Sequence, residues 1–145
     1  MSQLISLTDT HIHLYAEEFQ SDLQALVDAA QASGVKRMLL PNIDVESIDP
    51  LLNLTRKYSD WCFPMMGLHP CYVKEDFKEQ LELVRKSLVD NRTVMKAVGE
   101  IGLDFHWDLS FKQQQEEAFL MQLDWAHEFG LPISIHARKS TEEII

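Results

Sequence analysis

Short apolar segments alternate with helical periodicity along the whole chain, and this alternation limits the fold more than any other feature. Strand-like segments cover residues 4–9, 35–40, 61–67, 94–100 and 132–136. Between them, apolar residues recur three or four positions apart, which is typical of one face of a helix. Strict alternation of strands and helices predicts right-handed βαβ units around a parallel sheet. We therefore expect an α/β chain with five strands and four complete helices.

Two glycines mark expected helix ends. Gly34 follows a helical run that includes Phe19, and Gly130 follows a longer run over residues 111–129. Glycine directly after the last turn is a common helix stop, because it adopts the left-handed conformation without strain. Both positions agree with the predicted alternation.

The chain's length and composition indicate one globular domain. Its 145 residues are too few for two ordinary domains, and 46% of them are hydrophobic. No apolar run reaches the roughly 18 residues of a membrane helix, and no secretion signal is visible. Cys62 and Cys71 form no CxxC pair, so we expect reduced thiols and a cytoplasmic location.

The formal net charge of −10 limits the ways of binding nucleic acid. Binding through neutralised phosphates needs a basic face, which this composition disfavours. A nucleic-acid substrate stays compatible with the charge, because bound metal ions can supply positive charge locally.

The last residues begin an element that the chain does not continue. Ser140 and Glu143 have the spacing of a capping box, which opens a helix, and only two residues follow. We expect that residues 1–145 form a single barrel domain that is incomplete at its C-terminal end. A frayed natural C-terminus is the alternative.

Potential metal ligands follow the first strand. His11 and His13 stand two residues apart, and in an extended chain such residues point to the same side. Two imidazoles on one side can chelate one divalent cation. Two solvent-facing histidines are the alternative reading.

A carboxylate is expected at the end of the fourth strand. Val94 and Val98 indicate that this strand is buried, and Glu100 closes it. A buried carboxylate is costly without a partner. The spacing alone leaves a metal ion and an arginine as equal alternatives for that partner.

The third and fifth strands also lead into polar side chains. His136 ends the fifth strand, and Arg138 is placed to hold a phosphate at two points, or to form a surface ion pair. His69 follows the third strand, where a substrate contact and a plain loop histidine are both reasonable. His127, within the fourth helix, is expected to be structural, and His106 stays unassigned.

These side chains share one place in the predicted fold, the carboxyl ends of parallel strands. That face carries the catalytic residues of parallel α/β barrels. Imidazoles and carboxylates suit hydrolytic zinc, manganese or magnesium sites. The set predicts metal-activated water, with Glu100 placed to bridge two ions.

Four motifs resemble the TatD family of metal-dependent deoxyribonucleases. They are residues 9–14 (DTHIHL), 67–70 (GLHP), 99–104 (GEIGLD) and 135–138 (IHAR). Their order and spacing match the family over essentially the whole chain. The resemblance implies a TIM-type (β/α)8 barrel, of which this chain covers about the first five strands and four helices. It also implies two divalent metal ions (Mg, Mn or Zn) and DNA as the substrate.

The resemblance also implies residue roles. His11 and His13 would bind one metal, Glu100 would bridge to a second metal as the catalytic carboxylate, and His136 would bind that second metal. His69 and Arg138 would lie on the substrate side. Asp104 matches a motif aspartate that we do not assign as a ligand. Ile12, where the family often has a small or thiol residue, should point away from the site.

A full barrel has about 250 residues, and the family pattern continues with a further histidine and aspartate ligand. We therefore expect open sheet edges that promote self-association, marginal folding and impaired catalysis from this chain alone.

Two alternatives to a deoxyribonuclease stay open. One is another barrel hydrolase acting on amides, lactones or small phosphoesters. No lysine closes the fourth strand, as it would in enzymes with a carbamylated lysine ligand, so we favour the phosphodiesterase. The other alternative is a truncated, non-catalytic remnant.

Overall fold

The computed structural model describes residues 6–145, which form five strands and five α-helices. The strands are β1 (Leu7–Asp9), β2 (Val35–Pro41), β3 (Cys62–Met66), β4 (Ala97–Asp104) and β5 (Ile133–Arg138). The helices are α1 (Leu23–Ala32), α2 (Ile48–Lys57), α3 (Phe77–Asp90), α4 (Lys112–Phe129) and α5 (Thr141–Ile144), with 3₁₀ turns η1 (Glu17–Phe19) and η2 (Pro70–Tyr72). All neighbouring strands pair in parallel, in the order β1-β2-β3-β4-β5. The predicted parallel alternation is confirmed.

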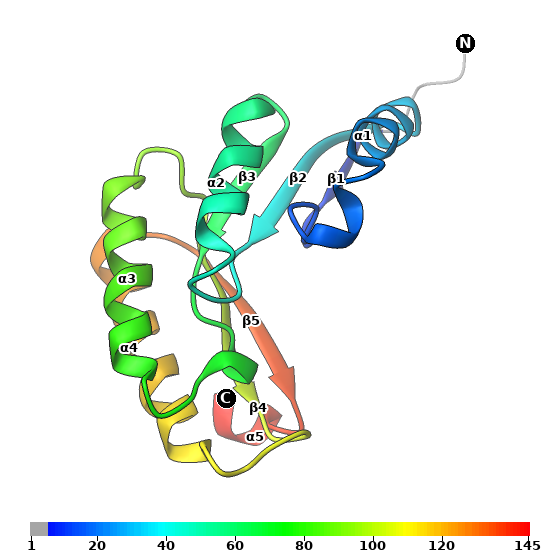
Figure 1. Ribbon diagram of the computed structural model, residues 1–145. Coiled ribbons are helices and arrows are strands. Elements are labelled where there is room, and N and C mark those ends of the chain that lie inside the picture. Colours follow the sequence, from blue (N-terminus) through cyan, green and yellow to red (C-terminus); the bar gives the residue numbers. More distant parts are fainter. Residues whose placement is uncertain (1–5) are drawn as a thin grey trace.

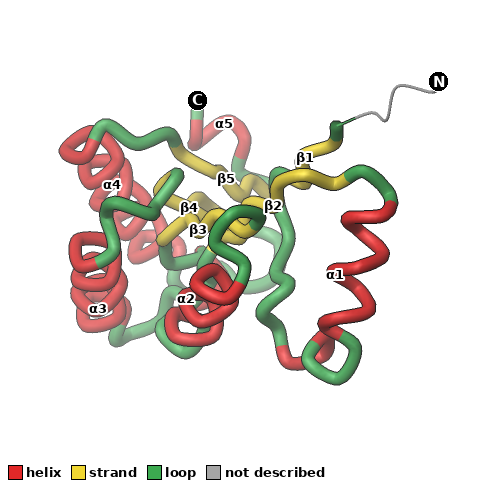
Figure 2. Tube along the Cα trace, turned by 90° about the horizontal axis from the view of Figure 1, so that it is seen from above, coloured by secondary structure: helices red, strands yellow, loops and turns green. Residues whose placement is uncertain are grey.

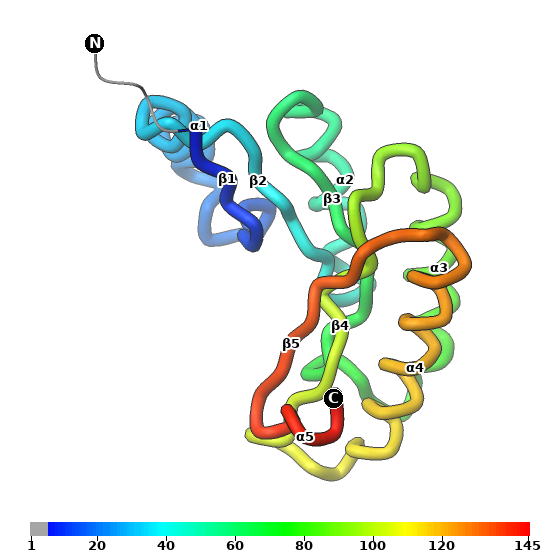
Figure 3. Tube along the Cα trace, turned by 180° about the vertical axis from the view of Figure 1, so that it is seen from behind, coloured from blue at the N-terminus to red at the C-terminus, as the bar shows by residue number. Residues whose placement is uncertain are grey.

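The sheet curls, and its strands run in one direction with their carboxyl ends toward the bottom of Figure 1. Seen from above, helices α1 to α4 are arranged around the outer side of the curled sheet (Figure 2). Strands β1 and β5 form its two edges (Figure 3). No helix among residues 6–145 is long and apolar enough to cross a membrane.

The core lies between the sheet and these helices. Leu40 of β2, Met66 of β3 and Val98 of β4 have no measurable exposure, and Leu51 and Leu88 bring helices α2 and α3 onto them. All eight residues of β4 are buried. Burying such side chains is the main favourable term in folding, at about 1.5–3 kcal/mol for each large apolar residue. Strand β4, which carries Glu100 and Asp104, is therefore buried along its whole length.

The predicted bounds of the fourth strand are wrong at both ends. Val94 precedes β4 and is 48% exposed, and the strand continues four residues past Glu100 to Asp104. Residues 91–94 form a turn after α3, in which Val94 N–H donates to the Asn91 carbonyl at 3.0 Å. Glu100 consequently lies inside the strand and not at its end.

The N-terminal elements are shorter than the pattern predicted. Strand β1 begins at Leu7, and residues 4 and 5 of the predicted strand lie outside the described residues. Phe19 belongs to η1 and not to the first α-helix, which begins at Leu23. Residues 20–22 separate the two elements, so the helical spacing from Phe19 did not reflect one continuous helix.

The C-terminal capping box does not form. Ser140 is the residue before α5, as the spacing predicts, but its hydroxyl donates to the Leu103 carbonyl at 2.7 Å. The Ser140 side chain is buried and accepts no hydrogen bond from α5. It therefore fixes the start of α5 to the end of β4.

Strands β4 and β5 approach unusually closely at Gly102. Its φ of +145° is rarely adopted by other residues, and a Cβ there would lie 2.0 Å from the His136 carbonyl oxygen. The ladder between these strands also shifts register between Val98 and Ile101, which is a β-bulge. Glu100 lies in this bulge, and its backbone N–H donates to the Asn42 carbonyl at 3.0 Å. The bulge and the glycine bring Glu100 and His136 together.

Candidate metal centre

The first pair of candidate ligands lies just past β1. His11 N–H donates to Oδ1 of Asp9 at 3.0 Å, and Ile12 N–H donates to the Leu39 carbonyl at 3.1 Å. These bonds hold the segment so that Nε2 of His11 and Nε2 of His13 are 3.3 Å apart. Ile12 packs against the hydrophobic core, as predicted, while the two imidazoles turn toward β4.

Glu100 presents one carboxylate oxygen to each of two histidine pairs. Oε2 lies 3.0 Å from Nε2 of His11 and 3.7 Å from Nε2 of His13. Oε1 lies 3.2 Å from Nδ1 of His136 and 3.7 Å from Nε2 of His69. The side chain of Glu100 is only 9% exposed, so its carboxylate contacts these imidazoles in place of most of the water around it.

His13 is oriented by groups on its far side. Its Nδ1 lies 2.9 Å from the Tyr15 hydroxyl and 3.2 Å from the Pro41 carbonyl, and Tyr15 itself donates to that carbonyl at 2.6 Å. A proton on Nδ1 leaves the lone pair of Nε2 free to bind a cation. Burial, with help from His11, lowers the pKa of His13, which favours this neutral form.

His136 lies between two carboxylates. Nε2 is 2.8 Å from Oδ2 of Asp104, and Nδ1 faces Oε1 of Glu100. The hydrogen bond with Glu100 raises the pKa of His136 against the effect of burial, and Asp104 adds to the increase. When Nε2–H donates to Asp104, Nδ1 and the Glu100 oxygen are two acceptors facing each other, so the position suits a proton or a cation.

His69 is held in the opposite tautomer. Its Nδ1 accepts a hydrogen bond from Cys71 N–H at 3.1 Å, so the proton of the neutral ring is on Nε2. Nε2 lies 3.1 Å from Nδ1 of His136. Burial lowers the pKa of His69 to about 4, partly opposed by Glu100, so the ring is neutral at physiological pH. Nε2–H is therefore a hydrogen-bond donor directed into the cluster.

These side chains form two candidate cation groups that share Glu100. His11, His13 and Glu100 make one group, and His69, Glu100 and His136 make the other, with the ligand atoms of each group within 4.8 Å of one another. Burial raises the pKa of Glu100, but the bond with His136 and the neighbouring imidazoles lower it overall, so the carboxylate is ionised. Neutral imidazoles around a shared, ionised carboxylate fit divalent metal ions.

The remaining predicted residues lie around this cluster. The guanidinium carbon of Arg138 lies 4.9 Å from the centre of the Trp107 ring, and no ion pair joins Arg138 to another residue among 6–145. His106 packs edge-on against Trp107, with ring centres 4.6 Å apart. His127 is exposed on α4, outside both groups, and its exposure does not support a role in core packing.

Asp104 is closer to the site than the motif alone indicated. Glu100 and Asp104 are four residues apart in one strand, so the period of two could have placed both on one side. Burial raises the pKa of Asp104, but the backbone N–H of His106 and the bond with His136 lower it overall. Asp104 is an ionised partner of His136.

Two buried glutamines of α4 also position the site. The spacing of apolar residues did not predict their role, because glutamine is polar. Gln122 bonds both backbone groups of Leu68, accepting from N–H at 2.7 Å and donating to the carbonyl at 3.2 Å. Gln115 accepts from Asp104 N–H at 2.9 Å. The two glutamines are seven residues apart on one helical face. They fix the segments that carry His69 and Asp104.

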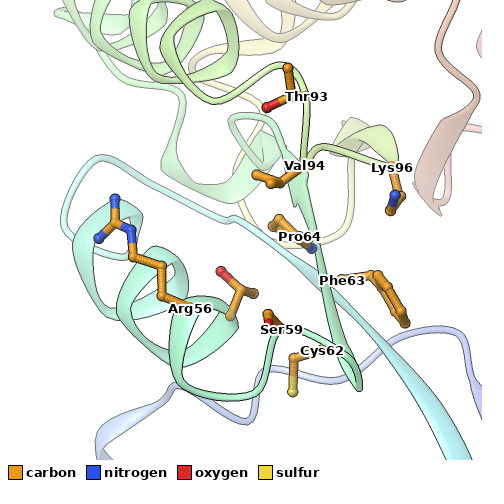
Figure 4. A pocket seen from close by; sticks show the side chains of 9 residues that line it. Arg56, Ser59, Cys62, Phe63, Pro64, Thr93, Val94 and Lys96 are labelled. Carbon is orange, nitrogen blue, oxygen red and sulfur yellow. The ribbon is translucent and has the colours of Figure 1, made fainter.

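A separate hollow of about 200 Å³ lies near the amino ends of β3 and β4 (Figure 4). Its lining includes Arg56, Cys62, Phe63, Val94 and Lys96. Burial raises the pKa of the Cys62 thiol to about 12, so the thiol is protonated and unreactive. None of the candidate ligands lines this hollow. The side chains that could bind a metal lie instead at the carboxyl ends of the strands.

The sequence of the chain is similar to those of known proteins. The model of a family described as TatD related DNase matches residues 8–145. A protein named "Uncharacterized metal-dependent hydrolase YabD" from Bacillus subtilis is 35% identical over 96% of this chain and 53% of its own length. A protein named "3'-5' ssDNA/RNA exonuclease TatD" from Pantoea ananatis is 32% identical over 92% of this chain and 51% of its own length. The chain thus spans about half the length of these relatives.

Solved structures show the same fold. The crystal structure of YJJV, a TatD homolog from Escherichia coli K12, superposes with a TM-score of 0.88 at 28% identity, over 97% of this chain and 54% of that one. A TatD family hydrolase from Entamoeba histolytica superposes with a TM-score of 0.85 at 19% identity, over 95% of this chain and 52% of that one. The five strands therefore match part of a TIM-type barrel, which confirms the predicted fold class.

Proposed function

The chain belongs to the TatD related DNase family, and on that premise we propose that it is a metal-dependent phosphodiesterase acting on DNA. The observation that carries the proposal is the position of Glu100, whose two carboxylate oxygens face two different histidine pairs. With one oxygen directed at each histidine pair, this carboxylate could serve as a ligand to two divalent ions at once.

In this proposal His11, His13 and Glu100 would hold one divalent ion, and Glu100 and His136 would hold a second. When bound, such ions would supply positive charge to a phosphate and lower the pKa of water at neutral pH. Tyr15 and Pro41 keep Nε2 of His13 free for binding. Asp104 orients His136 by accepting its Nε2–H, as partners of metal-bound histidines commonly do.

His69 has a different role from the other histidines. Although Nε2 of His69 lies in the second candidate group, its Nδ1 accepts from Cys71 N–H, so Nε2 carries the proton and in this form offers no lone pair to a cation. We assign it to hold a phosphate oxygen of the substrate. The guanidinium of Arg138 adds charged donors for the same phosphate group.

Three relatives support nucleic acid as the substrate class by their names. The Pantoea ananatis relative is named as an exonuclease of single-stranded DNA and RNA, and relatives from two Erwinia species carry the same name. The Bacillus subtilis relative is named only as a metal-dependent hydrolase. We propose DNA, with other phosphoesters as the alternative.

Two free cysteines support our proposal of a cytoplasmic location. Cys62 is buried, Cys71 is partly buried, and neither is in a disulfide. Reduced thiols are normal in the cytoplasm, where glutathione and thioredoxin maintain them.

The test is hydrolysis of a labelled DNA oligonucleotide by this chain with Mg²⁺, Mn²⁺ or Zn²⁺ and with a chelator. We expect slow hydrolysis that needs the metal and is lost in His11→Ala and Glu100→Ala. His127→Ala is the control, because His127 is an exposed histidine outside the cluster. Hydrolysis that survives both substitutions would contradict the mechanism, and metal binding without any hydrolysis would favour the non-catalytic alternative.

A further inference from the structure

One of the three tryptophans differs from the others in exposure. Trp61 and Trp125 are buried, at 6% and 5% exposure, whereas Trp107 is 71% exposed. Trp107 lies in the loop between β4 and α4, three residues after Asp104. A large aromatic ring in water at the mouth of a polar site is available for contact with a ligand.

The exposed ring is held in place by a cation. The guanidinium carbon of Arg138 lies 4.9 Å from the ring centre of Trp107, within the range of a cation–π contact. Arg138 is the last residue of β5, two residues after His136, and its carbonyl accepts from Phe105 N–H at 2.9 Å. Trp107 stays 71% exposed with this contact in place.

A hollow of about 230 Å³ lies beside Trp107 and Asp104. Its apolar walls include Trp107, Phe111 and Pro70, and its charged lining groups are Asp104, Asp108 and Lys74. Asp104 is the carboxylate that contacts His136, so the hollow lies next to the candidate metal centre. Lys74 lies 5.2 Å from the centre of the Phe111 ring and adds a positive charge at this hollow.

The charge of the chain decides which part of a nucleic acid this surface would bind. With a net charge of −10, attraction for a phosphate backbone is weak away from the metal centre. Stacking of a base on an aromatic ring needs no net charge and tolerates any base sequence. A base paired inside a duplex has no free face, so stacking selects single strands.

We propose that Trp107, fixed by Arg138, is a stacking platform for an unpaired nucleobase next to the phosphate at the metal centre. The base lies on the open part of the indole at the hollow, and the edge of the Arg138 guanidinium stays available to the phosphate. The platform confers a preference for single-stranded substrate. This inference rests on the nucleic-acid substrate proposed above, but it concerns binding and not the hydrolytic step.

Binding of labelled oligonucleotides, measured by fluorescence anisotropy with a chelator present to prevent hydrolysis, tests the platform. The probes are a single-stranded oligothymidylate, a strand of equal length without bases, and a duplex. We expect the parent chain to bind the oligothymidylate more tightly than the other two probes. Trp107→Leu should weaken that binding about 5- to 150-fold, while Trp107→Phe retains most of it.

Leu109→Ala is the matched control, because Leu109 is 61% exposed in the same loop and has no aromatic ring. Tryptophan emission gives an independent reading: oligothymidylate should quench the exposed Trp107 in the parent and not the buried Trp61 and Trp125 in Trp107→Phe. Far-ultraviolet circular dichroism checks that each variant keeps the fold.

The outcomes separate this inference from the proposed function. Equal affinity of the parent and Trp107→Leu, equal affinity for the base-free strand, or no binding of oligothymidylate would overturn the platform. If the same chain still hydrolyses DNA with metal, the phosphodiesterase survives that result. A Trp107-dependent affinity in a chain that never hydrolyses DNA would support the platform and contradict the proposed activity.

Discussion

Nε2 of His136 lies 2.8 Å from Oδ2 of Asp104, at the carboxyl ends of adjacent strands β5 and β4. Asp104 is 2% exposed, so the pair is formed mostly away from water. The contact fixes the ring so that Nδ1 faces Glu100. Asp104 thus determines which nitrogen of His136 is offered to the shared carboxylate.

Asp104→Asn should weaken metal binding about 10- to 100-fold without unfolding the chain, because loss of the charge leaves His136 less well oriented and less basic. The pKa of His136 should fall toward its ordinary value. Titration calorimetry with Mn²⁺ and the pH dependence of the His136 ring signals in nuclear magnetic resonance measure the two effects. Asp108→Asn is the control, since exposed Asp108 lies in the same loop, accepts from Ser110 N–H and belongs to neither candidate cation group. Equal Mn²⁺ affinity in both variants would contradict the role of Asp104.

Because His69 is buried as a neutral ring, we expect the folded chain to lose stability in acid. Its folded-state pKa of about 4 lies below the unfolded value of 6.5, so the unfolded chain binds the proton first. Stability from the neutral ring is complete above pH 6.5 and is lost as the pH falls toward 4. The two values correspond to about 3 kcal/mol in the free energy of unfolding.

His69→Asn keeps an acceptor for Cys71 N–H and removes the titration. Urea unfolding with a chelator present measures the free energy of unfolding of both proteins. Between pH 7 and pH 4 this free energy should fall by about 3 kcal/mol more in the parent than in the variant. Glu100 and Asp104 lose stability in acid in both proteins, so the comparison removes the part of their contribution that does not depend on His69. Parallel pH profiles for the two proteins would show that His69 is not buried as a neutral ring.

We expect that replacing the buried polar side chain of Gln122 lowers the free energy of unfolding. Gln122→Met keeps the length of the side chain but leaves N–H and C=O of Leu68 without their partners. Unfolding should become easier by about 1–3 kcal/mol, measured in urea, because each buried unpaired group pays its desolvation penalty. Gln113→Met, on the exposed face of the same helix, should change stability by less than about 0.5 kcal/mol. Equal effects would mean that Leu68 finds other partners.

The sequence predicted the sheet well because the period of two and the period of 3.6 differ clearly over most of the chain. The long helix over residues 111–129 matches α4 within one residue, and Gly130 follows it with a φ of +62°. Strand bounds were less certain, because Val94 is apolar yet lies in an exposed turn. Apolar character alone does not show whether a residue belongs to a strand or to the turn before it.

The geometry around Glu100 could not be derived from spacing. The bulge between Val98 and Ile101 and the close approach at Gly102 are properties of the packed pair of strands. The tautomer of His69 depends on Cys71 N–H, a local contact that the motif does not encode. Residue identities therefore predicted the members of the candidate site, whereas their individual roles depend on hydrogen bonds visible only in the structure.

The number of Mn²⁺ ions bound per chain tests the central claim that Glu100 is shared by two cations. Titration calorimetry of the parent chain and Glu100→Gln, with exposed Glu142→Gln as the control, measures it directly. We expect two sites in the parent and in Glu142→Gln, and the loss of at least one site in Glu100→Gln, because the amide replaces the ionised carboxylate. No Mn²⁺ binding by the parent, or two unchanged sites in Glu100→Gln, would contradict the account.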